Sequence, residues 1–106
     1  MSQNNRKEQE TELLAAFRHP LRRELYREIR ESKGSGISPR ELATKLEEPL
    51  SNVSYHVRVL ADAAAIECFK TVPVRGSQQH FYKVNPEVAK IEWVHAIARL
   101  GERTAA

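Results

Sequence analysis

Two short helical patterns lie only a few residues apart near the middle of the sequence, and this spacing restricts the fold more than any other feature. The first opens at Ser38 and Pro39, because serine caps a helix, proline suits the first helical position, and Glu41 completes a capping box. A second apolar period begins at Val53, after a connection at residues 47–50 that is too short to leave the neighbourhood. The sequence therefore predicts two packed helices joined by a tight turn over residues 38–65, with a buried side made of Leu42, Ala43, Leu46, Val53, Val57 and Leu60.

A β-rich pair of segments follows directly. Residues 66–72 and 78–84 are rich in β-branched and aromatic side chains, and turn residues at 73–77 separate them. We expect an antiparallel hairpin over residues 66–84 with a loose tip. Asn85 and Pro86 then start a last helix, which we expect to run over residues 86–101.

The N-terminal part carries a longer helical pattern. Apolar residues recur at spacings of three and four from Leu13 to Ile29, and Pro20 interrupts them, so we expect two helices or one kinked helix, with the second opening at His19. Residues 1–10 are polar and lack this period, and we expect a flexible lead-in that becomes helical near Glu8 or Glu10. For residues 11–106 the expected fold is mainly α with a β-hairpin, a winged helix-turn-helix.

Composition excludes several classes of protein. A chain of 106 residues holds one domain and has no room for a cofactor domain beside a substrate domain. Its one cysteine, Cys68, allows neither an intramolecular disulfide nor a thiolate zinc site within the chain, so we expect a reducing, cytoplasmic location. No apolar run approaches the roughly 18 residues of a membrane span. The net charge of +3 permits an acidic partner such as nucleic acid but does not require one.

The second helix of the close pair has a polar outer side suited to a DNA groove. Short polar side chains there let a helix approach base edges, Arg58 can reach a guanine or a phosphate, and Asn52 can pair with adenine. Any solvated helix is polar outside, but the place of this helix in the motif favours DNA contact. The predicted contacts on it are Ser51, Asn52, Ser54, Tyr55 and Arg58.

The hairpin supplies a second predicted contact surface. Arg75 and Ser77 lie at its tip and Lys70 on one arm, which suits a minor groove or a phosphate, although an ordinary polar turn has the same composition. Ser38 and Arg40, at the start of the first helix of the pair, complete the predicted DNA contacts. The densest basic cluster lies elsewhere, at residues 18–30, where several arginines are expected to pair with glutamates along their own helix. Arg22 and Arg23 are either phosphate contacts or solvated or dimer-rim ion pairs.

Several of these motifs together resemble an ArsR-type bacterial transcriptional regulator. The similarity covers about residues 12–85, and its most specific part is the run Val53-Ser54-Tyr55-His56 with Leu60 four residues further on. The resemblance implies a homodimeric winged helix protein, usually a repressor, whose recognition helices enter successive major grooves. The sequence departs from the family in having Ala63-Ala64-Ala65 where a glycine is usual, Glu48 where an apolar residue is usual, and no paired-cysteine metal motif.

The resemblance also implies that the first and last helices form the dimer interface. The last helix is apolar around more than one side, so a second copy is a natural cover. The predicted interface residues are Leu13, Leu14, Phe17, Ile91, Val94, Ile97 and Ala98. A small-molecule or ion effector is possible but not identifiable, and Glu92 with His95 across the dimer axis is a weak candidate for zinc.

The remaining reactive side chains point to structural roles. His56 is expected to make structural hydrogen bonds, and Cys68 is expected to be buried beside Ile66. No spacing suggests a nucleophile with its base, so we assign no catalytic, cofactor or metal residues and expect no enzyme. The leading prediction is a dimeric, sequence-specific regulator that binds double-stranded DNA. The alternative is a winged helix that binds proteins, which the modest charge and the acidic Glu47-Glu48 pair would suit.

Overall fold

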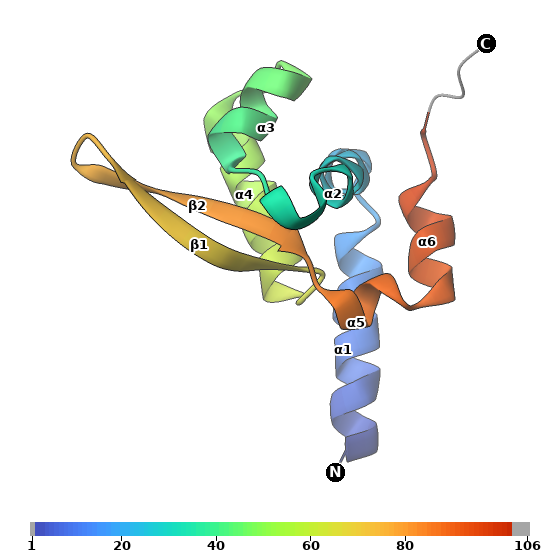
Figure 1. Cartoon of the computed structure of the whole chain (residues 1–106). Helices are drawn as coiled ribbons and strands as arrows, with labels where there is room; N and C mark the ends of the chain where they lie inside the picture. Colours follow the sequence, from blue (N-terminus) through green and yellow to red (C-terminus); the bar gives the residue numbers. More distant parts are fainter. Residues whose placement is uncertain (1, 103–106) are drawn as a thin grey trace.

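The computed structural model describes residues 2–102 and shows a helical body from which a long hairpin projects (Figure 1). This arrangement confirms the predicted winged helix-turn-helix, mainly α with one antiparallel hairpin. The elements in chain order are α1 (Ser2–Ala16), α2 (Pro20–Glu31), the 3-10 turn η1 (Lys33–Ser35), α3 (Pro39–Leu46), α4 (Leu50–Asp62), β1 (Ile66–Val74), β2 (Ser77–Val84), α5 (Pro86–Ala89) and α6 (Glu92–Ala98).

The core lies where α1, α2 and α4 meet, closed by the C-terminal helices. Phe17 and Tyr26 pack edge to face with ring centroids 4.9 Å apart, and Leu25, Ile29 and Leu60 are fully buried around them. Burial of such apolar side chains is the main contribution that stabilises the folded state of a domain of this size.

Helix starts follow the predicted capping signals. His19 Nδ1 accepts the backbone N–H of Leu21 at 3.1 Å, and Pro20 occupies the first position of α2, so the break between α1 and α2 is confirmed. At α3 the Ser38 hydroxyl accepts from the Glu41 backbone at 3.2 Å, while the Glu41 carboxylate accepts from the Ser38 backbone at 3.0 Å. Both polar groups of the predicted capping box are therefore satisfied.

Two helical boundaries differ from the prediction. The helix α1 begins at Ser2 rather than near Glu8 or Glu10, because good helix formers such as glutamine, lysine and glutamate continue a helix without an apolar period. The single helix expected over residues 86–101 is instead α5 and α6, separated by an extended residue, Ile91, with φ −78° and ψ 122°. This turn in the chain lets Val94 and Ala98 pack into the core, and neither glycine nor proline marks it in the sequence.

The hairpin is tighter at its tip and more exposed along its length than predicted. Its pairing runs from Ile66 with Val84 to Val74 with Ser77, with a bulge at Phe69, and the tip is a two-residue turn rather than a loose loop. Because the hairpin stands away from the core, Cys68 is exposed, and the prediction that it is buried is wrong. At its base, Tyr82 exchanges backbone hydrogen bonds with Ile37 at 3.0 and 3.1 Å, which ties the wing to the body.

The turn between α4 and the wing contains a non-glycine residue in the left-handed region. Ala64 has φ 64°, at the place where ArsR-type sequences usually have glycine, and Asn85 Nδ2 donates to its carbonyl oxygen at 2.8 Å. A left-handed alanine costs about 1–2 kcal/mol that glycine avoids. The side chain of Asn85 helps to hold this conformation.

Replacing Ala64 by glycine is expected to raise the free energy of unfolding by about 0.5–1 kcal/mol, because the relief of strain exceeds the entropy that glycine loses on folding. Urea denaturation followed by circular dichroism measures this change. Ala43→Gly, within α3, is the control and is expected to lower the free energy of unfolding by about 1 kcal/mol. If both variants were destabilised alike, Ala64 would not be strained.

Candidate nucleic-acid interface

The outer side of α4 is an exposed polar surface. Val53, Val57 and Leu60 on its inner side are fully buried, whereas Tyr55 on its outer side is 58% exposed. Of the predicted DNA contacts on this helix, Ser51, Asn52, Tyr55 and Arg58 are exposed and Ser54 is half-buried. These five residues thus share the face that points away from the core, which is the geometry a groove-reading helix requires.

Arg58 lies where α4 approaches the base of the wing. Burial raises the pKa of Tyr82, and the nearby Cys68 adds to this, while the positive charge of Arg58 lowers it in part. Asp62 of the same helix raises the pKa of Tyr82, so both signs of charge on α4 act on β2. The position of Arg58 joins the two surfaces on which the sequence places DNA contacts.

A polar cleft of about 510 Å³ lies between the start of α3 and the tip of the hairpin. It is lined by Arg40, Val74, Arg75, Ser77 and Gln79. Neither arginine forms an ion pair within residues 2–102, so both guanidinium groups are available to an anion. Gln79 was not predicted, although it lies two residues after Ser77 and therefore on the same face of β2.

Ser38 does not belong to this surface. Its side chain is fully buried, and both its hydroxyl and its backbone N–H are used in the capping box of α3. The prediction that Ser38 contacts DNA is therefore wrong, and its role is to fix the start of α3 next to Arg40.

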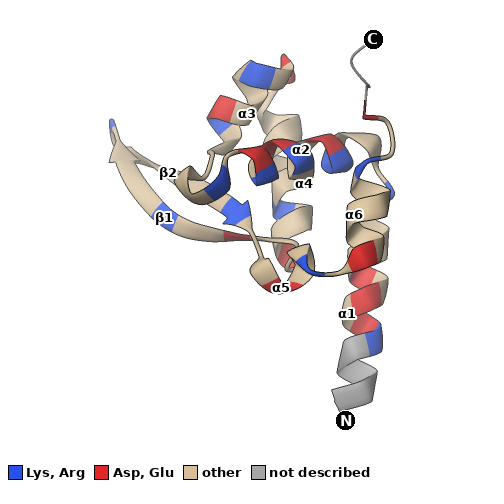
Figure 2. Ribbon diagram, turned by 45° about the vertical axis from the view of Figure 1, so that its right-hand side comes forward, with Lys and Arg blue, Asp and Glu red and all other residues tan. Residues whose placement is uncertain are grey.

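Lysines on the wing lie over aromatic rings. The ammonium group of Lys70 is 4.7 Å from the centre of the Phe81 ring and 5.7 Å from that of Phe69, and Lys83 lies 5.4 Å from the centre of Phe69. Such cation–π contacts hold a charge in place while leaving it accessible. Figure 2 shows several basic positions and one acidic position along the hairpin, whereas α3 and α2 each carry both signs of charge.

Arginines of α2 bind the ends of other helices. Arg22 Nε donates to the Ala16 carbonyl at 2.6 Å, Arg23 Nη1 to that of Phe17 at 2.8 Å, and Arg27 Nη1 to that of Ala98 at 2.6 Å. Cations at a helix C-terminus satisfy its free carbonyls and complement its dipole. Arg22 and Arg23 are thus caps, and the expected pairing with glutamates along their own helix does not occur among the described residues.

Four of the predicted dimer contacts are buried within one protomer. Leu13, Phe17, Val94 and Ala98 are at most 1% exposed, so they belong to the core and cannot meet a second chain. The sequence pattern did not separate core from interface because both use apolar residues at helical spacing. Leu14 remains 42% exposed, and Ile91 and Ile97 are half-buried.

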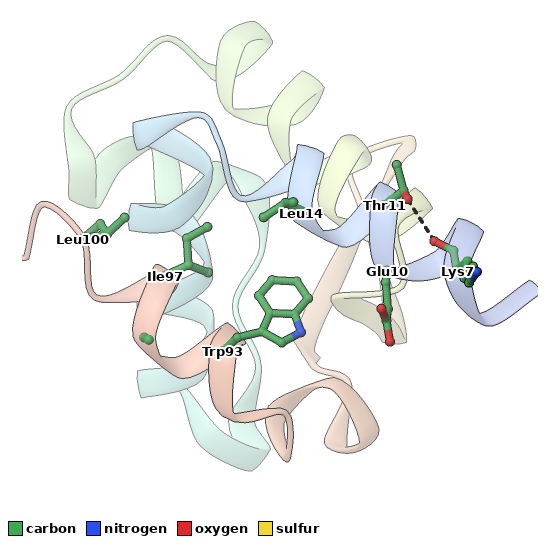
Figure 3. A pocket seen from close by; sticks show the side chains of 8 residues that line it. Lys7, Glu10, Thr11, Leu14, Trp93, Ile97 and Leu100 are labelled. Carbon is green, nitrogen blue, oxygen red and sulfur yellow. Dashed lines mark hydrogen bonds between the residues drawn. The ribbon is translucent and has the colours of Figure 1, made fainter. Parts of the chain in front are cut away.

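Leu14 and Ile97 border an apolar cleft of about 730 Å³ between α1 and α6, whereas Ile91 does not line it. Figure 3 shows Trp93 and Ile97 of α6 lying opposite Leu14 of α1. Leu100, which is 55% exposed, closes one end, and Lys7, Glu10 and Thr11 border the other. Trp93 and Leu100 were not among the predicted interface residues.

No site for a metal is evident in the part of the chain that the structure describes. His95 Nε2 lies 2.7 Å from the carbonyl oxygen of Ala89, and among residues 2–102 no three histidine, cysteine or carboxylate side chains are grouped to hold an ion.

Within the same residues, every helix is too short or too polar to cross a membrane.

Together, the packed pair α3–α4, the adjoining hairpin and the exposed outer side of α4 define a winged helix-turn-helix protein. Residues 17–68 match the family model described as a helix-turn-helix domain. Among curated proteins, none matches the chain significantly.

Two solved structures share this fold. Reduced HlyU from Vibrio cholerae is 19% identical, with a TM-score of 0.67 over 96% of this chain and 98% of that one. The transcriptional regulator HlyU from Vibrio vulnificus is 24% identical, with a TM-score of 0.57 over 94% of this chain and 88% of that one. At these identities the two structures show a shared fold, and together with the helix-turn-helix match they bear out the winged helix-turn-helix architecture.

Proposed function

We propose that this protein is a homodimeric repressor that binds specific sequences in double-stranded DNA. In this proposal α4 enters the major groove, and the wing lies on the minor groove or the phosphates. The observation that carries it is the exposed polar outer side of α4 beside a wing whose tip forms a cleft with two arginines. The cleft suits a backbone phosphate, because guanidinium groups bind phosphate oxygens through paired hydrogen bonds.

The backbone of the wing tip supports a functional role for Arg75. Both turn residues have positive φ, 46° at Arg75 and 80° at Gly76. Such a turn favours asparagine, aspartate or glycine at its first position, so an arginine there costs stability. Strain of this kind is usually retained where the side chain is needed, here to reach an anion.

A second copy of the chain is the proposed occupant of the α1–α6 cleft. Leu14 and Leu100 are more than one-third exposed on its rim, and covering them would remove apolar surface from water. The DNA-facing surface also argues for two copies, because Arg40, Arg58, Lys70, Arg75 and Lys83 are few cations for one tight complex. Two protomers would bring two recognition helices to two half-sites.

Selection of bound duplexes from a random-sequence pool tests the proposal. The purified protein should enrich a two-fold symmetric motif at moderate salt, and a footprint on the enriched sequence should span two half-sites. The motif placed over a promoter should lower reporter expression when the protein is present. If no motif were enriched over the input pool, specific DNA binding would be rejected in favour of a winged helix that binds proteins.

Replacing the arginine on the recognition helix and replacing the arginine on the wing should change DNA binding in different ways. Arg58→Ala is expected to relax base preference at one position of each half-site by about 1–3 kcal/mol, because a side chain that reads a base edge is lost. Arg75→Ala should weaken binding to all sequences similarly and reduce the salt dependence, because a phosphate contact is lost. Titrations of the enriched site and its single-base variants at several salt concentrations measure both effects. The reverse pattern would exchange the assigned roles of helix and wing.

A further inference from the structure

Three side chains form a compact joint where the α1–α2 connection meets the recognition helix α4. The His56 ring is 6% exposed, and its centroid lies 4.3 Å from that of His19. Arg22 Nη1 lies 3.0 Å from His56 Nδ1. A guanidinium group can only donate, so Nδ1 of His56 is the acceptor and the ring is neutral with its proton on Nε2.

Through Arg22, this joint connects α4 to the C-terminal end of α1. The other nitrogens of the same guanidinium donate to the carbonyl of Ala16 at 2.6 Å and to that of Ala15 at 3.3 Å. The helix α1 also forms one wall of the apolar cleft, through Leu14. Arg22 therefore links the proposed dimer surface directly to the helix proposed to read DNA.

On the DNA-facing side, the joint continues to Tyr55. The Tyr55 ring stands edge to face with the His56 ring at 5.0 Å between centroids, and Tyr55 is the most exposed large hydrophobic side chain of α4. A change in the position of His56 would therefore also displace Tyr55, which lies on the surface proposed to face DNA.

We propose that Arg22 and His56 are positioning residues that hold the recognition helix at a fixed place relative to the dimer surface, and that protonation of His56 loosens this joint and weakens operator binding. The inference rests on the proposed function, since it concerns the geometry of DNA binding. A protonated ring has no acceptor for Arg22, and it would place a second positive charge 3.0 Å from the guanidinium.

The groups around the ring oppose its protonation. Burial is the largest cause of a lowered pKa at His56, followed by the positive charges of His19 and Arg22, while Glu48 in the turn before α4 acts in the opposite direction. From α1, the joint receives backbone carbonyls, and Glu12 of α1 and Asp62 of α4 border a neighbouring cleft with Arg22. Because the unfolded chain binds the proton more tightly than the folded one, stability is fully present above about pH 6.5 and falls as the pH drops toward the lowered pKa.

Operator binding measured by fluorescence anisotropy between pH 5.5 and pH 7.5, at constant ionic strength, tests the inference. The wild-type protein should bind more weakly at pH 5.5 than at pH 7.5, by less than about tenfold, because the pKa of His56 is lowered from its ordinary value and its protonation is incomplete at pH 5.5. A general gain of positive charge at lower pH would have the opposite sign, because it would strengthen the attraction to DNA. The direction of the change therefore separates the joint from general electrostatics.

Variants assign the effect to individual residues. His56→Gln keeps an acceptor for Arg22 but cannot take up a proton, so it should bind normally at pH 7.5 and show no loss at pH 5.5. His95→Gln, in α6, is the matched control and should keep the full loss. His19→Asn retains a good cap for α2 and removes a neighbouring ring that opposes the protonation of His56, so the loss should begin at a higher pH.

Results that contradict the inference can be told apart from results that contradict the proposed function. Equal or tighter wild-type binding at pH 5.5, or the same loss in His56→Gln, would overturn the inference and leave the proposed function standing. If His56→Gln did not fold, an unchanged pH dependence in His19→Asn would overturn it instead. Absence of specific binding at every pH would reject the proposed function and this inference together.

Discussion

Replacing Gly36 by alanine is expected to lower the free energy of unfolding by about 2–5 kcal/mol. Gly36 has φ +72°, and a Cβ atom there would lie 2.1 Å from Cε1 and 2.8 Å from Cζ of the Phe69 ring. The left-handed conformation costs alanine about 1–2 kcal/mol, and displacing the bulged Phe69 adds a packing cost of about 1–3 kcal/mol. The same backbone oxygen of Tyr82 that holds the wing lies 3.1 Å from the added atom.

Urea denaturation of Gly36→Ala and Gly34→Ala separates the cost of the conflict at Gly36 from the general effect of replacing a glycine. Gly34→Ala is the matched control, because no atom lies within 4 Å of its added Cβ, and its free energy of unfolding should change by less than about 0.5 kcal/mol. Combining Gly36→Ala with Phe69→Leu should recover part of the loss, since it removes the steric conflict but not the backbone strain. Equal stabilities of the Gly34 and Gly36 variants would show that the hairpin does not pack on residue 36 as described.

Replacing Leu14 by glutamate is expected to convert the dimer to a monomer and to weaken operator binding by at least 100-fold. Leu14 is 42% exposed in the isolated protomer, so the fold should tolerate the charge, whereas a second copy in the cleft would have to bury it. Loss of one of two linked binding sites removes a gain in apparent affinity of about 10²–10⁴-fold. Light scattering coupled to size-exclusion chromatography measures the assembly, and anisotropy measures binding.

Gln9→Glu provides the control for charge on the same helix. Gln9 is exposed on α1 and does not line the cleft, so this variant should remain dimeric and bind the operator within about twofold of the wild type. A dimeric Leu14→Glu protein with normal operator binding would remove the α1–α6 cleft from the proposed interface.

Most of the fold could be predicted because its boundaries carry local chemical signals. Pro20 with His19 opens α2, Ser38 with Glu41 opens α3, and the change from a helical to a β-rich pattern after Ala65 starts the wing. The break at Ile91 had no such signal. It arises from packing of Val94 and Ala98 in the core, which is a tertiary effect that the local sequence does not encode.

The candidate site was predicted less completely, because exposure and partners depend on the fold. The outer side of α4 followed from its apolar period, but nothing local shows that Ser38 is buried or that Cys68 lies on a hairpin standing clear of the core. From the sequence, the roles of the arginines of α2 were inferred from their charge alone. Their carbonyl partners belong to residues up to 77 positions away, which no helical spacing reveals.

The arginines of α2 that cap other helices affect the separation of the half-sites that a dimer would select. A single rigid helix binds the C-terminal ends of both α1, through Arg22 and Arg23, and α6, through Arg27. These two helices form the walls of the cleft. In a dimer built on that cleft, these three guanidinium groups would help to set the distance between the two recognition helices. Homologous regulators with different side chains at these positions would be expected to prefer half-sites with a different separation.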